Sequence, residues 1–87
     1  MKKILLVDDS LEYLGALSSV IEKNFEVYTA TGVKDALRLM DHKKIEAICS
    51  DYNMKDGTGL ELIEYIRQKG ITVPFLLMSG DDDCRLE

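Results

Sequence analysis

The chain has 87 residues, 46% hydrophobic and 31% charged, a composition typical of one small globular domain. A net charge of -5 without a basic stripe argues against direct binding to nucleic acid, and no apolar run approaches the length of a membrane span. The apolar part of the N-terminus is too short for a signal peptide, and Cys49 and Cys84 are read as free thiols. We therefore expect a cytoplasmic domain.

The first predicted strand, residues 4–7, is an apolar run that ends on the pair Asp8-Asp9. Ser10 is placed to cap a helix after this strand, because apolar residues recur there at helical spacing. They are Leu11, Leu14, Leu17, Val20 and Ile21. Residues 25–29 then alternate apolar and polar side chains, which predicts a strand at the edge of a sheet.

A second helix is expected after Thr31, a suitable N-cap, because four apolar residues follow at helical spacing. They are Val33, Ala36, Leu37 and Met40. The next predicted strand, residues 47–50, is a short apolar run that brings Asp51 to the rim of the sheet. We read residues 51–57 as a loop.

Thr58 and Glu61 have the spacing of a capping box and open a third predicted helix. Its predicted buried stripe is Leu62, Ile63 and Ile66. Gly70 is placed to stop this helix. Residues 73–78 form the fourth predicted strand, in which Pro74 is tolerated near the start.

Strands that alternate with helices predict an α/β domain with a parallel sheet covered on both faces. In such sheets the ligand site lies beyond the carboxyl ends of the strands. Asp8, Asp9, Asp51 and Ser79 all fall at carboxyl ends. Like charges about 4 Å apart repel by roughly 4 kcal/mol at an effective dielectric of about 20. We expect a bound cation to offset this repulsion, and carboxylate oxygens are suitable ligands for Mg²⁺.

In combination, these motifs resemble the receiver domain of bacterial two-component response regulators. The matching motifs are the acidic pair Asp8-Asp9, the later aspartate Asp51, the signature Gly59-Leu60-Glu61, and Ser79 after the fourth strand. The resemblance covers residues 3–80. It implies a flavodoxin-like, doubly wound parallel sheet, here truncated to about four strands in the order 2-1-3-4 and three helices.

The resemblance implies that Asp51 accepts a phosphoryl group from a phosphohistidine on a histidine kinase or phosphotransfer protein. Mg²⁺ would be held by Asp9, by Asp51, by the main-chain carbonyl of Asn53 and, through water, by Asp8. Ser79 would hydrogen-bond the new phosphate and switch a surface that an output domain or protein partner reads. Such a domain assists its own phosphorylation and dephosphorylation, and is not a turnover enzyme.

The chain departs from the family pattern in two places. Lys55 stands where the family usually has proline, which changes the charge of the loop. The family's fourth helix, fifth strand and fifth helix have no counterpart, so the lysine that contacts the phosphoryl group is missing too. Residues 1–80 are thus expected to be an incomplete receiver domain. Residues 81–87 are expected to be a polar C-terminal tail, in which Leu86-Glu87 is consistent with a cloning remnant.

Without a fifth strand, the fourth predicted strand becomes an apolar edge, which is a template for pairing with another chain. We therefore expect a homo-oligomer such as a dimer, or a fragment of a longer protein. Three other functions stay open. A hydrolase with a nucleophilic aspartate would place a second acid where this chain has Asn53, and a flavin-binding module would replace Asp8-Asp9-Ser10 by a phosphate-binding loop. The third is a degenerate receiver that binds partners without phosphorylation.

Overall fold

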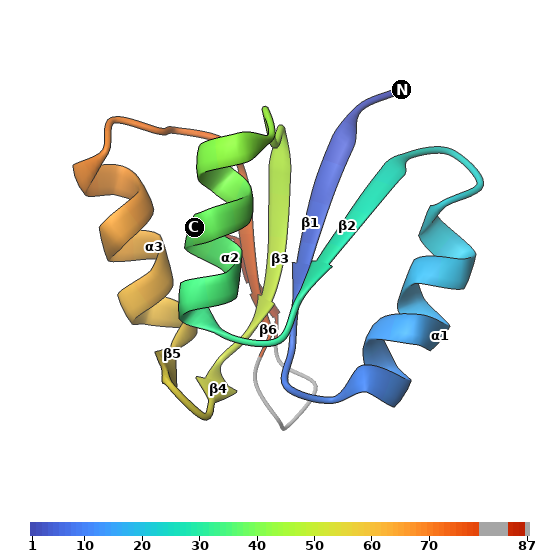
Figure 1. Cartoon of the computed structure of the whole chain (residues 1–87), viewed down its shortest axis with the longest axis horizontal. Coiled ribbons are helices and arrows are strands. Elements are labelled where there is room, and N and C mark those ends of the chain that lie inside the picture. The colour runs from blue at the N-terminus through green and yellow to red at the C-terminus, as the bar shows by residue number, and fades with distance from the viewer. Residues whose placement is uncertain (79–83, 87) are drawn as a thin grey trace.

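The computed structural model describes residues 1–78 and 84–86, and for residues 84–86 it describes the backbone. A five-stranded sheet has the order β2-β1-β3-β6-β7 (Figure 1). Its strands are β1 (Lys3–Val7), β2 (Glu26–Ala30), β3 (Ala47–Asp51), β6 (Phe75–Met78) and β7 (Cys84–Leu86). The first four strands in this order pair in parallel. The predicted α/β fold with strand order 2-1-3-4 is therefore confirmed, with β6 as the predicted fourth strand.

The three helices are α1 (Leu11–Ile21), α2 (Val33–His42) and α3 (Gly59–Gln68). Helices α2 and α3 lie together on one face of the sheet, and α1 lies on the other face (Figure 1). Each helix forms the crossover between two parallel strands, a connection too long for a simple turn. None of the helices in the described part of the chain has the length and apolar character of a transmembrane segment.

Side-chain caps begin two of the three helices as predicted. Ser10 and Thr58 each accept a hydrogen bond from a backbone N–H of the following helix, at 3.3 and 3.1 Å. The prediction that Thr31 caps the second helix is wrong. Helix α2 begins after Gly32, which has no side chain to accept such a bond.

The hydrophobic core lies between the sheet and the layer formed by α2 and α3. Leu5, Phe75, Leu62 and Ile66 are fully shielded from solvent there, and Ile63 packs against them. The predicted buried stripe of the third helix is thus confirmed for Leu62 and Ile66, and Ile63 is partly buried. Burying each such side chain contributes about 1.5–3 kcal/mol.

The apolar stripe predicted for the first helix is only partly buried. Leu14 is buried, whereas Leu11 is 73% and Val20 is 66% exposed. Helix α1 packs on β1 and β2, and it is the only helix on its face of the sheet among the residues described. A single helix can bury only one side of its surface against the sheet, so the remaining apolar side chains face solvent.

The prediction that the fourth strand forms an open edge of the sheet is wrong, because β7 pairs with β6. The pairing is antiparallel and places Cys84 opposite Met78 and Leu86 opposite Leu76. Residues 84–86, which were expected to lie in a polar tail, therefore extend the sheet by one strand.

The expected loop after Asp51 contains a short hairpin. Strand β4 (Asn53–Met54) pairs antiparallel with β5 (Gly57–Thr58), and Lys55 and Asp56 form the turn between them. Met54 is buried in the core cluster, so the hairpin is packed against the domain. Strands of two residues show no alternation that a sequence could display, although Asp56-Gly57 is a recognised turn signal.

Candidate functional site: three carboxylates at the ends of β1 and β3

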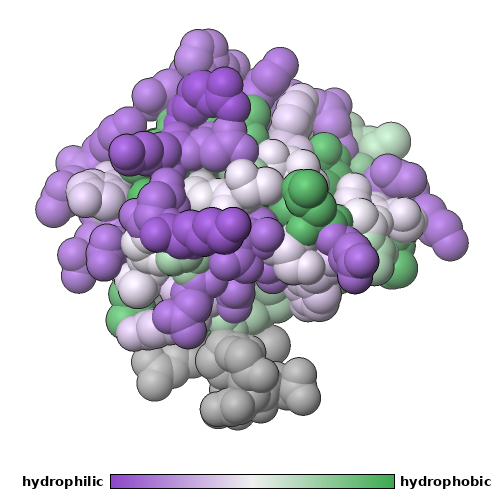
Figure 2. Space-filling model, turned by 60° about the horizontal axis from the view of Figure 1, so that its bottom comes forward, coloured by the Kyte–Doolittle hydropathy of each residue, from purple (hydrophilic) through white to green (hydrophobic). Residues whose placement is uncertain are grey.

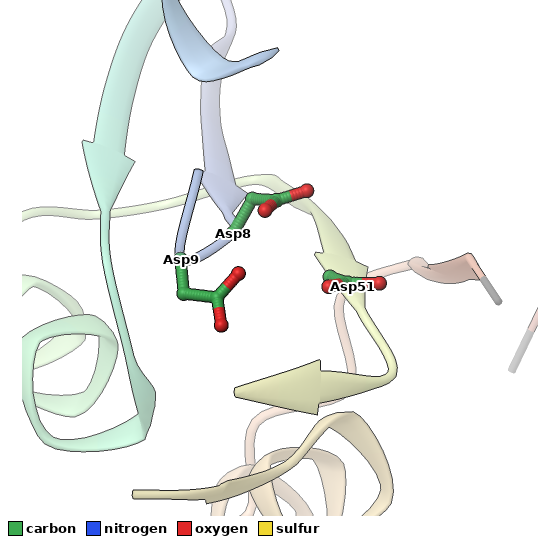
Figure 3. A group of neighbouring side chains, drawn as sticks. All are labelled: Asp8, Asp9 and Asp51. Atoms are coloured by element: carbon green, nitrogen blue, oxygen red, sulfur yellow. The ribbon is translucent and has the colours of Figure 1, made fainter. Parts of the chain in front are cut away.

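Three carboxylates meet at the carboxyl-terminal edge of the sheet (Figure 3). Strands β1 and β3 are parallel neighbours, so the residues that follow Val7 and Ser50 emerge side by side. One carboxylate oxygen from each of Asp8, Asp9 and Asp51 lies within 4.8 Å of the other two. The predicted convergence of these acids is confirmed, and their role as metal ligands stays a prediction.

The backbone orients two of the three carboxylates. Asp8 is 8% exposed, and its Oδ1 accepts the N–H of Ser10 at 2.9 Å. Asp51 Oδ1 accepts the N–H of Tyr52, also at 2.9 Å. Asp9 is exposed to solvent. The cluster therefore combines two held carboxylates with one at the surface, where an incoming ion can reach it.

The electrostatics of the site favour a bound cation. Burial raises the pKa of Asp51 above its usual value, and the nearby carboxylate of Asp8 raises this pKa further. The N–H of Tyr52 acts in the opposite direction, and Asp9 adds a smaller upward effect. The negative charge of Asp51 is thus incompletely compensated by the protein. Three carboxylate oxygens this close fit a divalent cation such as Mg²⁺, which binds hard oxygen ligands.

The surface around the cluster is mainly polar. Figure 2 looks toward the carboxyl-terminal edge of the sheet and shows mostly hydrophilic side chains, with hydrophobic ones in small separate patches. A surface of this kind suits a charged ligand better than an apolar one.

Gly59 allows α3 to begin directly behind the end of β3. Its N–H donates to the carbonyl of Tyr52 at 2.7 Å. A Cβ at this position would lie 2.7 Å from the carbonyl oxygen of Asp51 and would collide with the side chain of Leu77. The glycine of the Gly-x-Glu signature therefore keeps α3 against the strand that carries Asp51.

Two other predicted site residues are placed less directly. Asn53 lies in β4, two residues after Asp51, and its side chain is exposed, so its predicted role depends on the main-chain carbonyl. Ser79, the predicted switch residue, lies outside the described residues, as do residues 81–83 of the expected tail.

Sequence reasoning missed a role for Asp56. Its Oδ1 accepts the N–H of Val33 at 2.8 Å, and its Oδ2 accepts the N–H of Lys34 at 3.0 Å. Asp56 thus caps α2 from the hairpin. The bonds join residues more than twenty positions apart, so no local motif could reveal them. The available signal was an acid in a turn, because Thr31 was predicted to supply the cap.

Known proteins share both the sequence and the fold of this chain. A family model described as the response regulator receiver domain matches residues 4–86. The transcriptional regulatory protein YdfI of Bacillus subtilis is 36% identical, over 95% of this chain and 40% of that protein. The two-component response regulator ARR11 of Arabidopsis thaliana is 32% identical, over 93% of this chain and 16% of that protein.

Among solved structures, the chemotaxis response regulator CheY4 of Vibrio cholerae matches with a TM-score of 0.85 and 31% identity. That match covers 90% of this chain and 68% of the CheY4 chain. The N-terminal domain of a Wolinella succinogenes protein matches with a TM-score of 0.87 and 28% identity, over 92% of this chain and 65% of that one. The chain therefore spans less than half of the two curated relatives and about two thirds of these solved structures. The family match, the sheet order and the acidic cluster agree, and the chain belongs to the response regulator receiver domain family.

Proposed function

We propose that this chain accepts a phosphoryl group on Asp51 from a phosphohistidine of a histidine kinase or phosphotransfer protein. The single observation that carries the proposal is the meeting of Asp51 with Asp8 and Asp9 within 4.8 Å. An isolated surface aspartate would have neither a neighbouring pair of acids nor a raised pKa. A carboxylate that protein groups leave incompletely compensated is suited to hold a cation and to act as a nucleophile.

In the proposed reaction, a carboxylate oxygen of Asp51 attacks the phosphorus atom. A P–O bond forms, the P–N bond to the histidine breaks, and the departing ring nitrogen keeps the electron pair. Asp8, Asp9, Asp51 and the main-chain carbonyl of Asn53 would hold Mg²⁺, which supplies charge neutralisation for the transferred oxygens. The Tyr52 N–H holds the Asp51 carboxylate in place. Ser79 is proposed to bond the new phosphate and so to alter a surface that an output domain or protein partner reads.

The test is phosphorylation by acetyl phosphate in the presence of Mg²⁺, followed by intact mass. We expect the chain to gain the mass of one phosphoryl group, and to gain none when Mg²⁺ is chelated before the reaction. Asp51→Asn should gain no mass either. The control Glu64→Gln, which removes an exposed acid of α3, should be labelled like the parent chain. A receiver domain is not a turnover enzyme, so labelling should stop at one phosphoryl group per chain. A folded parent chain that gains no mass would contradict the proposal.

The degenerate-receiver alternative, which binds a partner or a second copy without phosphorylation, has one observation in its favour. Cys49, Leu76 and Met78 are only half-buried on the sheet face that α1 leaves partly open. Self-association through the edge of β6 is no longer supported, because β7 occupies that edge. Sedimentation velocity tests the remaining possibility, and a monomer at all concentrations would exclude a homo-oligomer. For either function we propose the cytoplasm as the compartment, since the sequence carries no disulfide framework.

A further inference from the structure

The tip of the β4–β5 hairpin is attached to the start of α2. Asp56 accepts two hydrogen bonds there, from the N–H groups of Val33 and Lys34, at 2.8 and 3.0 Å. Both carboxylate oxygens are used, one for each donor. These donors belong to the first turn of α2, and the N–H groups of a first turn have no acceptor within their own helix. The contact is therefore a two-point attachment between segments that are far apart in the sequence.

The attachment forms next to a glycine, which has no side chain in the way. Gly32 precedes α2, and a Cβ at that position would lie 2.6 Å from Asp56 Oδ1. The approach of the Asp56 carboxylate to the helix therefore requires glycine at position 32. The backbone N–H groups of Lys34 and Val33 also lower the pKa of Asp56, because their hydrogen bonds favour its ionised form.

The attachment connects the hairpin, through the start of α2, to the loop that carries Asp8 and Asp9. The N–H of Asp8 donates to the carbonyl of Ala30 at 3.0 Å, which joins the first acidic loop to the end of β2. Three residues later the chain reaches Val33, where Asp56 is bound. From Asp56 the hairpin leads back to Asp51, whose carboxylate faces Asp8. The base of the hairpin is held as well, since the N–H of Tyr52 donates to the carbonyl of Met78 at 2.8 Å.

We propose that Asp56 is a positioning residue that holds the β4–β5 hairpin, and with it Asn53, at a fixed spacing from the loop of Asp8 and Asp9. This inference rests on the proposed function, because the spacing matters only if the cluster binds a cation. Without Asp56, the hairpin would still be held at its base and through the buried Met54, but its tip would have no hydrogen bond to α2. The main-chain carbonyl of Asn53 would then be less fixed, and ordering it when the ion binds lowers the affinity.

The test is the Mg²⁺ dissociation constant, measured by isothermal titration calorimetry on the unphosphorylated chain. Asp56→Ala removes both bonds, and we expect it to weaken Mg²⁺ binding about tenfold, the lower end of the range for residues that orient metal ligands. Asp56→Asn removes the same charge but keeps one acceptor oxygen, so it should recover part of the affinity. The difference between these two variants reports the hydrogen bonds rather than the long-range effect of the charge.

Ile66→Val is the matched control for stability. Ile66 is fully buried in α3, and shortening it costs about 0.5–1.5 kcal/mol, a loss similar to that of a helix cap. We expect Ile66→Val to bind Mg²⁺ as the parent does. Parent-like binding by Asp56→Ala, with binding lost in Asp51→Asn, would overturn the positioning role and leave the cation site intact. A parent chain that binds no Mg²⁺ would overturn the proposed function and the role of Asp56 together.

Discussion

The two faces of the sheet are packed very differently. On the face of α2 and α3, side chains from the sheet and from both helices form one continuous buried cluster. On the face of α1, Leu6 and Leu14 are the buried hydrophobic residues in the described part of the chain that lie outside this cluster. Two adjacent helices exclude water from the strands between them, whereas one helix shields only the strands directly beneath it. The stability of the domain therefore comes mainly from one face.

The largest expected effect comes from comparing two adjacent leucines of β6 that point to opposite faces. Leu77 is 4% exposed within the core cluster, and Leu76 is half-buried on the side of α1. Leu77→Ala should lower the free energy of unfolding by about 2–5 kcal/mol. Leu76→Ala should cost clearly less, because less apolar surface is returned to water. Urea unfolding followed by circular dichroism measures both variants. Equal losses would contradict the difference between the faces.

A smaller loss is expected from Gly59→Ala, at the junction between the packed face and the acidic edge. The new methyl group would meet the carbonyl oxygen of Asp51 and the side chain of Leu77. The carbonyl cannot move without shifting β3, so overpacking should cost about 1–3 kcal/mol. The same urea experiment measures this cost. Gly15→Ala is the control, because nothing lies within 4 Å of a Cβ at that exposed helical position. That control should be neutral or slightly stabilising, since alanine favours a helix.

The smallest expected effect concerns charge rather than packing. In EDTA at pH 7, Asp51→Asn should be more stable than the parent, because the raised pKa of Asp51 means that its ionised form destabilises the fold. This penalty is complete above the folded-state pKa. It fades as the pH falls through that pKa, and it vanishes below the ordinary value of 3.8. Thermal unfolding between pH 7 and pH 3 should show the gap closing. A gap that stays constant with pH would assign the effect to packing.

The four parallel strands and the three helices were predictable because each relies on a local pattern, whereas the strand order 2-1-3-4 was implied by the resemblance to receiver domains. Apolar runs of strand length, helical spacing of apolar residues and capping side chains such as Ser10 and Thr58 are all read within a few positions. The convergence of Asp8, Asp9 and Asp51 was predictable on the condition that their strands are parallel neighbours, since acids that follow such strands emerge at one edge.

The exposure of Leu11 and Val20 could not be read from their spacing. A helical stripe shows which side chains can be buried, but burial also needs a surface to cover them, and the stripe of α1 is wider than the contact it makes. Strand β7 was missed because residues 84–86 carry no extended apolar run of their own. They become a strand because β6 offers unpaired backbone groups beside them.

The sequence by itself thus determined the alternation of strands and helices, the acids at the carboxyl-terminal edge of the sheet and membership of the receiver family. Only the tertiary structure decided how the edge is held together. The link from Asp56 to Val33 and Lys34 joins two segments through the free N–H groups of a helix, and these groups carry no information about which acid will bind them. Local patterns reflect interactions between near neighbours, whereas this contact exists because the fold brings the hairpin to the start of α2.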